Sequence, residues 1–349
     1  MERVKAFLKR KQIVISVQTY LIDALGAMAF GLFASLLIGT IFGTLGEKTG
    51  VVIFTTIAGY AKSATGAALG VSIAYALKAP TLVLFSAATV GIAGNELGGP
   101  VGALVATIIA AELGKIVSKE TPVDILVTPG VTIISGILAA QFVGPGVSAF
   151  MTAFGNLVKT ATVMQPLFMG ILVSALIGIA LTLPISSAAI CIMLSLDGLA
   201  GGAATAGCCA QMVGFAVLSF CENKWGGLVS QGIGTSMLQM GNIVKNPRIW
   251  IAPILTSAIT GPLATCLFKL QMNGTPVSSG MGTCGLVGQI GVYTGWVKDV
   301  SEGTKAAITT GDWAGLLLVS IILPAVICPI INMFLKKIGW VKEGDLKLS

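Results

Sequence analysis

The sequence predicts an all-α protein that crosses a lipid bilayer many times. Hydrophobic residues make up 55% of the chain and charged residues only 10%, a balance more apolar than that of soluble domains. Four long stretches contain no charged residue: 125–158, 160–196, 198–221 and 313–335. One membrane helix needs about 20 consecutive apolar residues, so each stretch is long enough for at least one crossing.

Glycine is the second compositional signal. The chain has 45 glycines among 349 residues, about 13% where about 7% is usual. Glycine lets membrane helices approach closely, and it permits broken helices and re-entrant loops whose backbone lines a cavity. Both features favour a transporter or a channel over a simple membrane anchor.

Basic residues gather at the two ends of the chain. Residues 1–18 are expected to form an amphipathic N-terminal helix at the cytoplasmic surface, and residues 338–349 a short cytoplasmic tail. The basic residues around these ends are Arg3, Lys5, Lys9, Arg10, Lys11, Lys336, Lys337, Lys342 and Lys347. Because basic flanks mark the cytoplasmic side, both termini are expected there, with an even number of crossings. This placement accounts for the net charge of +7, so no nucleic-acid partner is expected.

Apolar runs and their breaks place the spans in order. The expected spans are 20–45, 51–77, 101–118, 125–150, 163–183, 185–220, 249–270 and 313–335. Residues 81–94 are apolar but short for a crossing, and residues 298–312 resemble a loop in water. This order gives eight to ten crossings and one or two re-entrant segments in a single membrane domain, 1–349.

Prolines, glycines and isolated charges mark the interruptions. Pro80 precedes the short block, Pro129 and Pro145 kink the span at 125–150, and Pro184 divides the long uncharged region. The span at 185–220 is interrupted at Asp197. Residues 228–243 are apolar but rich in hydroxyl and amide side chains, which favours a re-entrant or cavity-lining element.

Two interruptions carry a carboxylate beside an amide. Asn95 and Glu96 lie between two apolar blocks, and Glu222 and Asn223 occupy a similar place in residues 203–244. Broken segments at corresponding positions of two halves point to a solute site, and ionisable residues at membrane depth are functional candidates. The alternatives are a loop tip in water for Glu96 and an interfacial turn for Glu222.

Further candidates are uncharged. Gln239, Asn242 and Gln289 are amides in apolar context that suit polyhydroxylated ligands, since each donates and accepts hydrogen bonds; hydrogen bonding between helices is the alternative. A glycine-rich loop adds Ser279, Gly280, Gly282, Thr283 and Gly285. Its GxGxxG pattern lacks a strand–turn–helix context, which excludes a nucleotide site. We expect its backbone to approach a solute or a neighbouring helix.

The sequence gives little support for an enzymatic function. The chain has no histidine, no acidic cluster suited to a metal and no nucleophile elbow, so neither a cofactor nor a metal is expected. The chain lacks catalytic residues of its own, and would at most be the translocating subunit of a larger system.

Four runs resemble one family: GIGTSMLQ at 232–239, NIVKNPRIWI at 242–251, GPLAT at 261–265 and GMGTCGLVGQI at 280–290. They are similar to stand-alone phosphotransferase-system sugar permeases (EIIC) of the second EIIC type, which include perfringolysin O regulator-like membrane proteins. The resemblance implies a homodimer of about ten helices per subunit, re-entrant hairpins and an occluded sugar site. Better-known sugar EIIC domains place a histidine and a glutamate near the phosphorylated hydroxyl, and this chain lacks the histidine.

The resulting hypothesis is a permease of the bacterial cytoplasmic membrane that moves a sugar or similar polar solute by alternating access. Separate IIA and IIB subunits are candidate partners, because no such domain is fused to the chain. Two alternatives stay open. One is a solute-sensing regulator without net transport, and the other is a carrier coupled to an ion gradient through its few buried acids.

Overall fold

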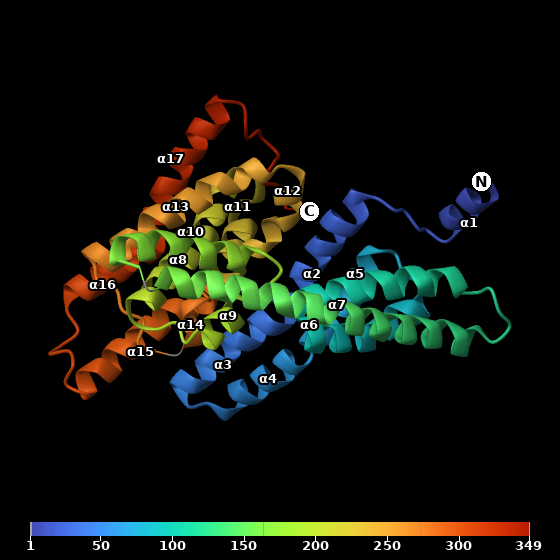
Figure 1. The fold of residues 1–349 in the computed structure, drawn as a ribbon, viewed down its shortest axis with the longest axis horizontal. Coiled ribbons are helices and arrows are strands. Elements are labelled where there is room, and N and C mark those ends of the chain that lie inside the picture. The colour runs from blue at the N-terminus through green and yellow to red at the C-terminus, as the bar shows by residue number, and fades with distance from the viewer. Residues whose placement is uncertain (1, 163, 275, 349) are drawn as a thin grey trace. The chain divides into compact units, whose positions relative to one another are not determined.

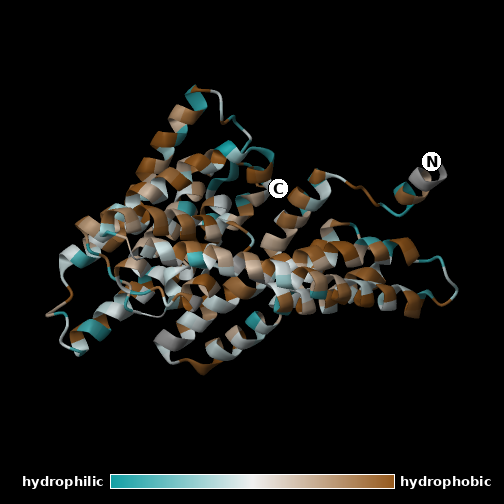
Figure 2. Ribbon diagram, viewed as in Figure 1, coloured by the Kyte–Doolittle hydropathy of each residue, from teal (hydrophilic) through white to brown (hydrophobic). Residues whose placement is uncertain are grey.

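The computed structural model describes residues 2–162, 164–274 and 276–348. These residues form helices and turns without a strand, and one isolated bridge pairs Gly198 with Met272. Six helices are long and apolar enough to cross a membrane: Gln18–Gly46, Thr81–Val117, Asp124–Thr162, Gly198–Leu218, Pro247–Leu267 and Thr310–Lys337. Figure 2 shows apolar residues along these helices and hydrophilic residues mostly in the turns. The predicted class, an all-α polytopic membrane protein, is confirmed.

The chain divides into two units, Met1–Phe150 and Met151–Ser349, which are described separately. The first unit holds the blue-to-green helices of Figure 1. They are α1 (Glu2–Arg10), η1 (Gln18–Asp23), α2 (Ala24–Leu32), η2 (Phe33–Leu37), α3 (Ile38–Thr49), α4 (Val52–Ser63), α5 (Thr65–Ala76), α6 (Thr81–Val117) and the start of α7 (Asp124–Thr162).

Helix α6 is a hairpin of two arms. Its backbone leaves helical geometry at Gly98 (φ −148°, ψ 20°) and Gly99 (φ 60°, ψ −160°), directly before Pro100. The arms fold back on each other, because Gly94 lies against Ala103 and Gly114 lies against Val83. The predicted interruption at residues 94–100 is therefore confirmed, and each arm packs through residues small enough for close contact.

Lys115 ties the end of α6 to two other segments of this unit. Its side chain is 1% exposed, yet its ammonium group donates to the carbonyls of Gln12 (3.1 Å) and Leu77 (3.0 Å) and pairs with Glu112 (2.9 Å). A buried charge is tolerated when it is paired and hydrogen-bonded in this way.

The N-terminal helix is shorter than predicted. Helix α1 ends at Arg10, whereas residues 1–18 were expected to be helical throughout. Gln12 then adopts φ 55°, which a right-handed helix cannot contain. The change of direction buries Ile13 and lets Lys11 reach the Ser118 carbonyl and the Glu120 carboxylate.

The second unit is built around α10 (Gly198–Leu218), which is buried along nearly its whole length. The remaining elements are α8 (Pro166–Thr182), α9 (Ser187–Met193), α11 (Phe220–Val229), η3 (Ser230–Gly234), η4 (Ser236–Gln239), α12 (Met240–Lys245), η5 (Pro247–Trp250), α13 (Ile251–Pro262), η6 (Leu263–Leu267), α14 (Pro276–Ser279), η7 (Cys284–Leu286), α15 (Val287–Ser301), α16 (Thr310–Leu317), η8 (Leu318–Ile322) and α17 (Leu323–Lys337). Helices α8, α13 and α17 pack against α10, and α13 also packs against α8 and α17.

Small residues set the spacing of these helices. Gly207 of α10 lies against the backbone of Ser174 in α8, and Gly170 of α8 lies against Gly261 of α13. Gly214 of α10 lies against Cys328 of α17. Helices in a bilayer associate through such close packing, because lipid supplies no hydrophobic driving force between them. The high glycine content is explained here by helix contact.

Residues 220–245 replace a regular span by short elements. Lys224 leaves helical geometry (φ 52°, ψ −151°), and Thr235 is extended (φ −159°, ψ 142°) between η3 and η4. This break and the one at Gly99 in α6 share nearly the same backbone angles. Residues 228–243 thus form short elements in place of a regular lipid-facing helix, and the re-entrant or cavity-lining role expected for them stays a prediction.

Candidate functional site

Asn95 and Glu96 lie at the tip of the first arm of α6. Asn95 is half-buried and Glu96 is exposed. Neither side chain hydrogen-bonds to, or forms an ion pair with, any residue that the structure describes in this unit. Both groups are therefore free to contact water or a solute.

Glu222 and Asn223 bind the C-terminal tail of the chain. The two carboxylate oxygens of Glu222 accept the backbone N–H groups of Gly344 (3.1 Å) and Leu346 (3.0 Å). Asn223 accepts the N–H of Leu348 (2.8 Å) and donates to the Leu346 carbonyl (2.8 Å).

Gln239 and Asn242 complete this contact. Gln239 donates to the Leu346 carbonyl (3.0 Å) and to Gln231 (2.8 Å), and Asn242 donates to the Lys347 carbonyl (2.9 Å) and to Gln239 (2.8 Å). Gln231 is fully buried and donates to Ser219 (2.7 Å). Four predicted residues thus converge, and their hydrogen bonds go largely to the tail backbone.

The tail also buries apolar side chains. Leu346 has no exposed surface and Val341 is 2% exposed. Asn246 holds the tail further along, donating to the Trp340 carbonyl (3.0 Å) and to Asp345 (2.8 Å). We call residues 340–348 the docked tail, and Glu222, Asn223, Gln239 and Asn242 the tail site.

The glycine-rich loop packs against α9 and α10. Ser279 donates to the Leu196 carbonyl (2.7 Å), and Gly280 lies against the backbone of Ser187. Gly282, at φ 53°, lies against Cys208. Of the two partners weighed from the sequence, a solute or a helix, the described contacts of these glycines are with the chain itself.

The remaining members of the loop lie near the middle of α10. Thr283 donates to the Gly232 carbonyl, and Gln289 donates to the Cys209 sulfur (3.2 Å). The buried Oε1 of Gln289 has no hydrogen-bond partner among the described residues. Gly285 adopts φ 51° at the turn into α15.

The predicted residues of the second unit therefore follow α10 from end to end. Ser279 lies beside Gly201 at the start of this helix, whereas Gln231 contacts Ser219 directly after its end. Gly201 and Ser219 are about 27 Å apart along the helix axis, at about 1.5 Å per residue. The candidates form a row across the unit.

Sequence reasoning missed a buried polar network between these ends. Gln211 of α10 accepts hydrogen bonds from Thr182 (3.2 Å) and from the Trp250 indole (2.8 Å), and donates to Ser257 (3.3 Å). Thr182 also bonds to Ser236 (2.8 Å). Gln211 therefore hydrogen-bonds between helices, which is the alternative role considered above for the other buried amides. Its partners are two hydroxyl residues and one indole, and their positions in the sequence gave no sign that they share a network.

A second unpredicted feature is a polar pocket beside the N-terminal end of α10. Its volume is about 540 Å³, and the lining includes Phe268, Trp296, Gln271, Asn273, Asp299 and Lys269. Asn273 donates to Asp299 (2.8 Å) and to Gln271 (3.2 Å). The bridge from Met272 to Gly198 fixes this segment at the start of α10. We call it the loop pocket, since residues 268–273 and 299–312 supply most of it.

No metal-binding site is found among residues 2–162, 164–274 and 276–348. No group of three or more His, Cys, Asp or Glu side chains there is arranged to hold an ion.

Comparison with known proteins identifies the family. The family described as "Phosphotransferase system, EIIC" matches residues 22–348, which include all the candidate residues above. A comparison with curated proteins finds no match, and neither does a comparison with solved structures. Because the match covers nearly the whole chain, the protein belongs to the phosphotransferase-system EIIC family.

Proposed function

We propose that this membrane permease binds a sugar or similar polyhydroxylated solute in its second unit and moves it across the bilayer by alternating access. One observation carries the proposal. Polar groups lie at both ends of the buried helix α10 and along it, with the loop pocket at one end and the tail site at the other. Such a row of donors and acceptors suits a solute that crosses an apolar layer.

The loop pocket has the chemistry that a sugar requires. Trp296 and Phe268 supply aromatic surface, while Asp299, Asn273 and Gln271 supply acceptors and donors. Small-molecule sites combine apolar surface with a few placed polar groups in this manner. With the C-terminus in the cytoplasm, as the basic flanks predict, this pocket faces the outside and receives the solute first.

Partners follow from family membership. Separate IIA and IIB subunits would bring a phosphoryl donor, because the chain has no histidine to carry the group itself. We further propose that the permease works as a homodimer in the bacterial cytoplasmic membrane, with both termini in the cytoplasm. The candidates Thr283 and Gln289 of the second unit would contact the solute during its passage.

Uptake by purified protein tests the proposal. Proteoliposomes containing only this protein would be supplied with a panel of labelled sugars, first alone and then with IIA and IIB partners and a phosphoryl donor. We expect uptake of at least one sugar, reduced by Asp299→Asn. Absence of uptake and of sugar binding under both conditions would reject the permease. Loss of uptake on dissipating the ion gradient would instead favour the ion-coupled carrier.

The docked tail favours one second candidate, a solute sensor. A solute that bonded to Glu222 would compete with the backbone of Leu346 for the same carboxylate and would release the tail. Solute binding without transport, together with solute-dependent exposure of residues 340–348, would identify that function.

A further inference from the structure

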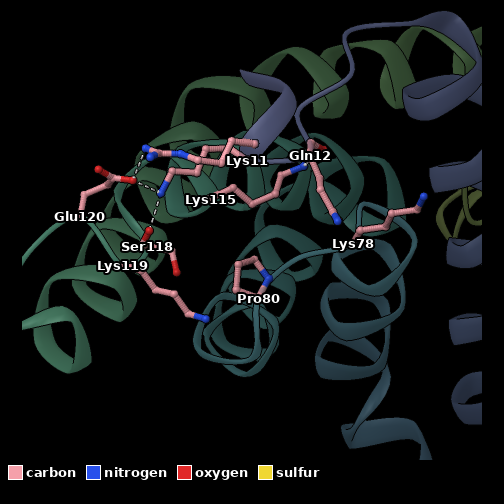
Figure 3. Close-up of a pocket in the computed structure, with 9 residues that line it drawn as sticks. Lys11, Gln12, Lys78, Pro80, Lys115, Ser118, Lys119 and Glu120 are labelled. Carbon is pink, nitrogen blue, oxygen red and sulfur yellow. Dashed lines mark hydrogen bonds and ion pairs between the residues drawn. The ribbon is translucent and has the colours of Figure 1, made fainter. Parts of the chain in front are cut away.

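A pocket at one end of the first unit collects basic side chains from separate segments of the chain. Its volume is about 440 Å³. Its charged lining residues are Arg10, Lys11, Lys78, Lys115, Lys119 and Glu120. Arg10 and Lys11 come from the end of α1 and the residue after it, Lys78 from the turn after α5, and Lys119 from the turn after α6. Figure 3 shows this arrangement, which we call the basic pocket.

Three of the five cations are already engaged. Lys115 is held by two carbonyls and Glu112, as described above. Lys11 and Arg10 both pair with Oε1 of Glu120, at 2.6 and 2.7 Å. The hydrogen bond from Lys11 lowers the pKa of Glu120 below its ordinary value, so this carboxylate is charged at neutral pH.

Two lysines have no such partner. The ammonium groups of Lys78 and Lys119 make no hydrogen bond or ion pair with the described residues, and Figure 3 places them at opposite margins of the pocket. Their backbones are left-handed, at φ 55° and φ 60°, so each ends the preceding helix. The pocket has five positively charged side chains. Three carboxylates lie near them, those of Glu112, Glu120 and Asp124, and the last accepts the Lys119 backbone N–H. Two positive charges therefore remain unbalanced.

Apolar residues flank the pocket on two sides. Val14 and Ile15, which follow Gln12 in the chain, are 57% and 79% exposed. Ile125 and Leu126, which follow the turn at Glu120, are both 72% exposed. Exposed apolar side chains in two neighbouring segments indicate contact with lipid rather than water. A soluble anion would use the charges of this pocket and leave the apolar flanks unexplained.

We propose that the basic pocket binds the headgroup of an anionic phospholipid. The anionic headgroup lies between the ammonium groups of Lys78 and Lys119, the free donors of Arg10 hydrogen-bond to its phosphodiester, and the acyl chains lie along the exposed residues around Ile15 and Leu126. Basic pockets between membrane helices on the cytoplasmic side bind anionic headgroups by this chemistry. The site is distinct from the solute path proposed above and does not depend on it.

Lipid binding to the full-length protein in detergent tests this site. The probes are short-chain phosphatidylglycerol, short-chain phosphatidylcholine and inorganic phosphate, with native mass spectrometry and Tm as readouts. We expect phosphatidylglycerol to bind and to raise Tm, and neither of the other probes to do so. The variant Lys78→Gln/Lys119→Gln should weaken phosphatidylglycerol binding by about 30-fold, since each basic residue near an anionic surface contributes about fivefold.

A matched control removes the same charge elsewhere. Lys336→Gln/Lys337→Gln replaces two exposed lysines at the end of α17 and should leave binding unchanged. Neither pair loses a hydrogen bond that the structure describes, so both variants should fold. Equal binding by the two variants would overturn the proposal. Equal binding of phosphatidylcholine would do so as well, and saturation by inorganic phosphate would instead identify a small-anion site.

Discussion

Glu222 holds the C-terminal tail by accepting the backbone N–H of Leu346 at 3.0 Å, 124 positions along the chain. The same carboxylate accepts the N–H of Gly344. Because its partners are backbone groups, these two hydrogen bonds depend on the path of the tail, which the buried side chain of Leu346 helps to hold. A residue predicted to bind solute is therefore occupied by the protein itself.

Replacing Glu222 by Gln should loosen the tail. The amide has one acceptor oxygen where the carboxylate has two, and its NH₂ group faces a backbone N–H. We expect a loss of about 1.5–3 kcal/mol, the usual range for hydrogen bonds to charged groups, seen as a lower Tm and faster proteolysis of residues 340–348. Glu343→Gln is the matched control, since its exposed side chain has no described partner. Equal Tm values and equal proteolysis rates for the two variants would contradict this prediction.

Leu346→Ala separates tail docking from solute binding. Leu346 is fully buried, and truncating such a side chain costs about 2–5 kcal/mol, which should release the tail while leaving Glu222, Asn223, Gln239 and Asn242 intact. If these four residues also contact the solute, its affinity should rise when the tail no longer competes. Calorimetric titration with a transported sugar measures this. Unchanged affinity with a demonstrably released tail would remove the tail site from the solute path.

The membrane class, the break at residues 94–100, the lack of a regular lipid-facing helix at residues 228–243 and the role of glycine in close helix packing could be predicted from the sequence. They depend on local composition: apolar length sets the spans, and Gly98, Gly99 and Pro100 are incompatible with a continuous helix. Glu222, Asn223, Gln239 and Asn242 were each selected from the sequence, but their convergence on the tail was not predicted, and their contact with a solute stays a prediction.

Other features depend on contacts that no local pattern encodes. The docked tail is bound through its backbone and through the buried side chains of Val341 and Leu346, and no local pattern in the tail predicts that docking. The loop pocket joins residues 268–273 to residues 299–312, and the basic pocket joins three segments through turns at Gln12, Lys78 and Lys119. Helix α1 ended earlier than predicted because Lys11 and Ile13 are fixed by tertiary contacts, which override periodicity.

Lys224 should be replaceable by glycine with a gain in stability. Its backbone (φ 52°, ψ −151°) lies close to a region that only glycine occupies readily, at a cost of about 1–3 kcal/mol for other residues. Glycine removes this strain but adds about 0.4–1 kcal/mol of chain entropy in the unfolded state, so a net gain of about 1 kcal/mol is expected. Lys224→Ala keeps the Cβ and should show no gain. Chemical unfolding of both variants measures the difference, and equal stability would argue against strain at this position.

Gly207 should tolerate no side chain, because it lies directly against the backbone of Ser174 where α10 packs on α8. A Cβ added there would overlap the carbonyl oxygen of Ser174, and the helices could accommodate it only by separating. That separation would also disturb Ser257, which donates to the Gly207 carbonyl (3.2 Å) and accepts from Gln211. We expect Gly207→Ala to destabilise the protein by about 1–3 kcal/mol, the usual cost of overpacking, and to lower solute uptake.

Gly59→Ala is the control for Gly207→Ala, since a Cβ added at this position in α4 meets nothing within 4 Å and alanine favours a helix by up to about 1 kcal/mol. Thermal unfolding should therefore move in opposite directions for the two substitutions, and a shift of the same sign would show that helix contact does not explain the glycine at position 207.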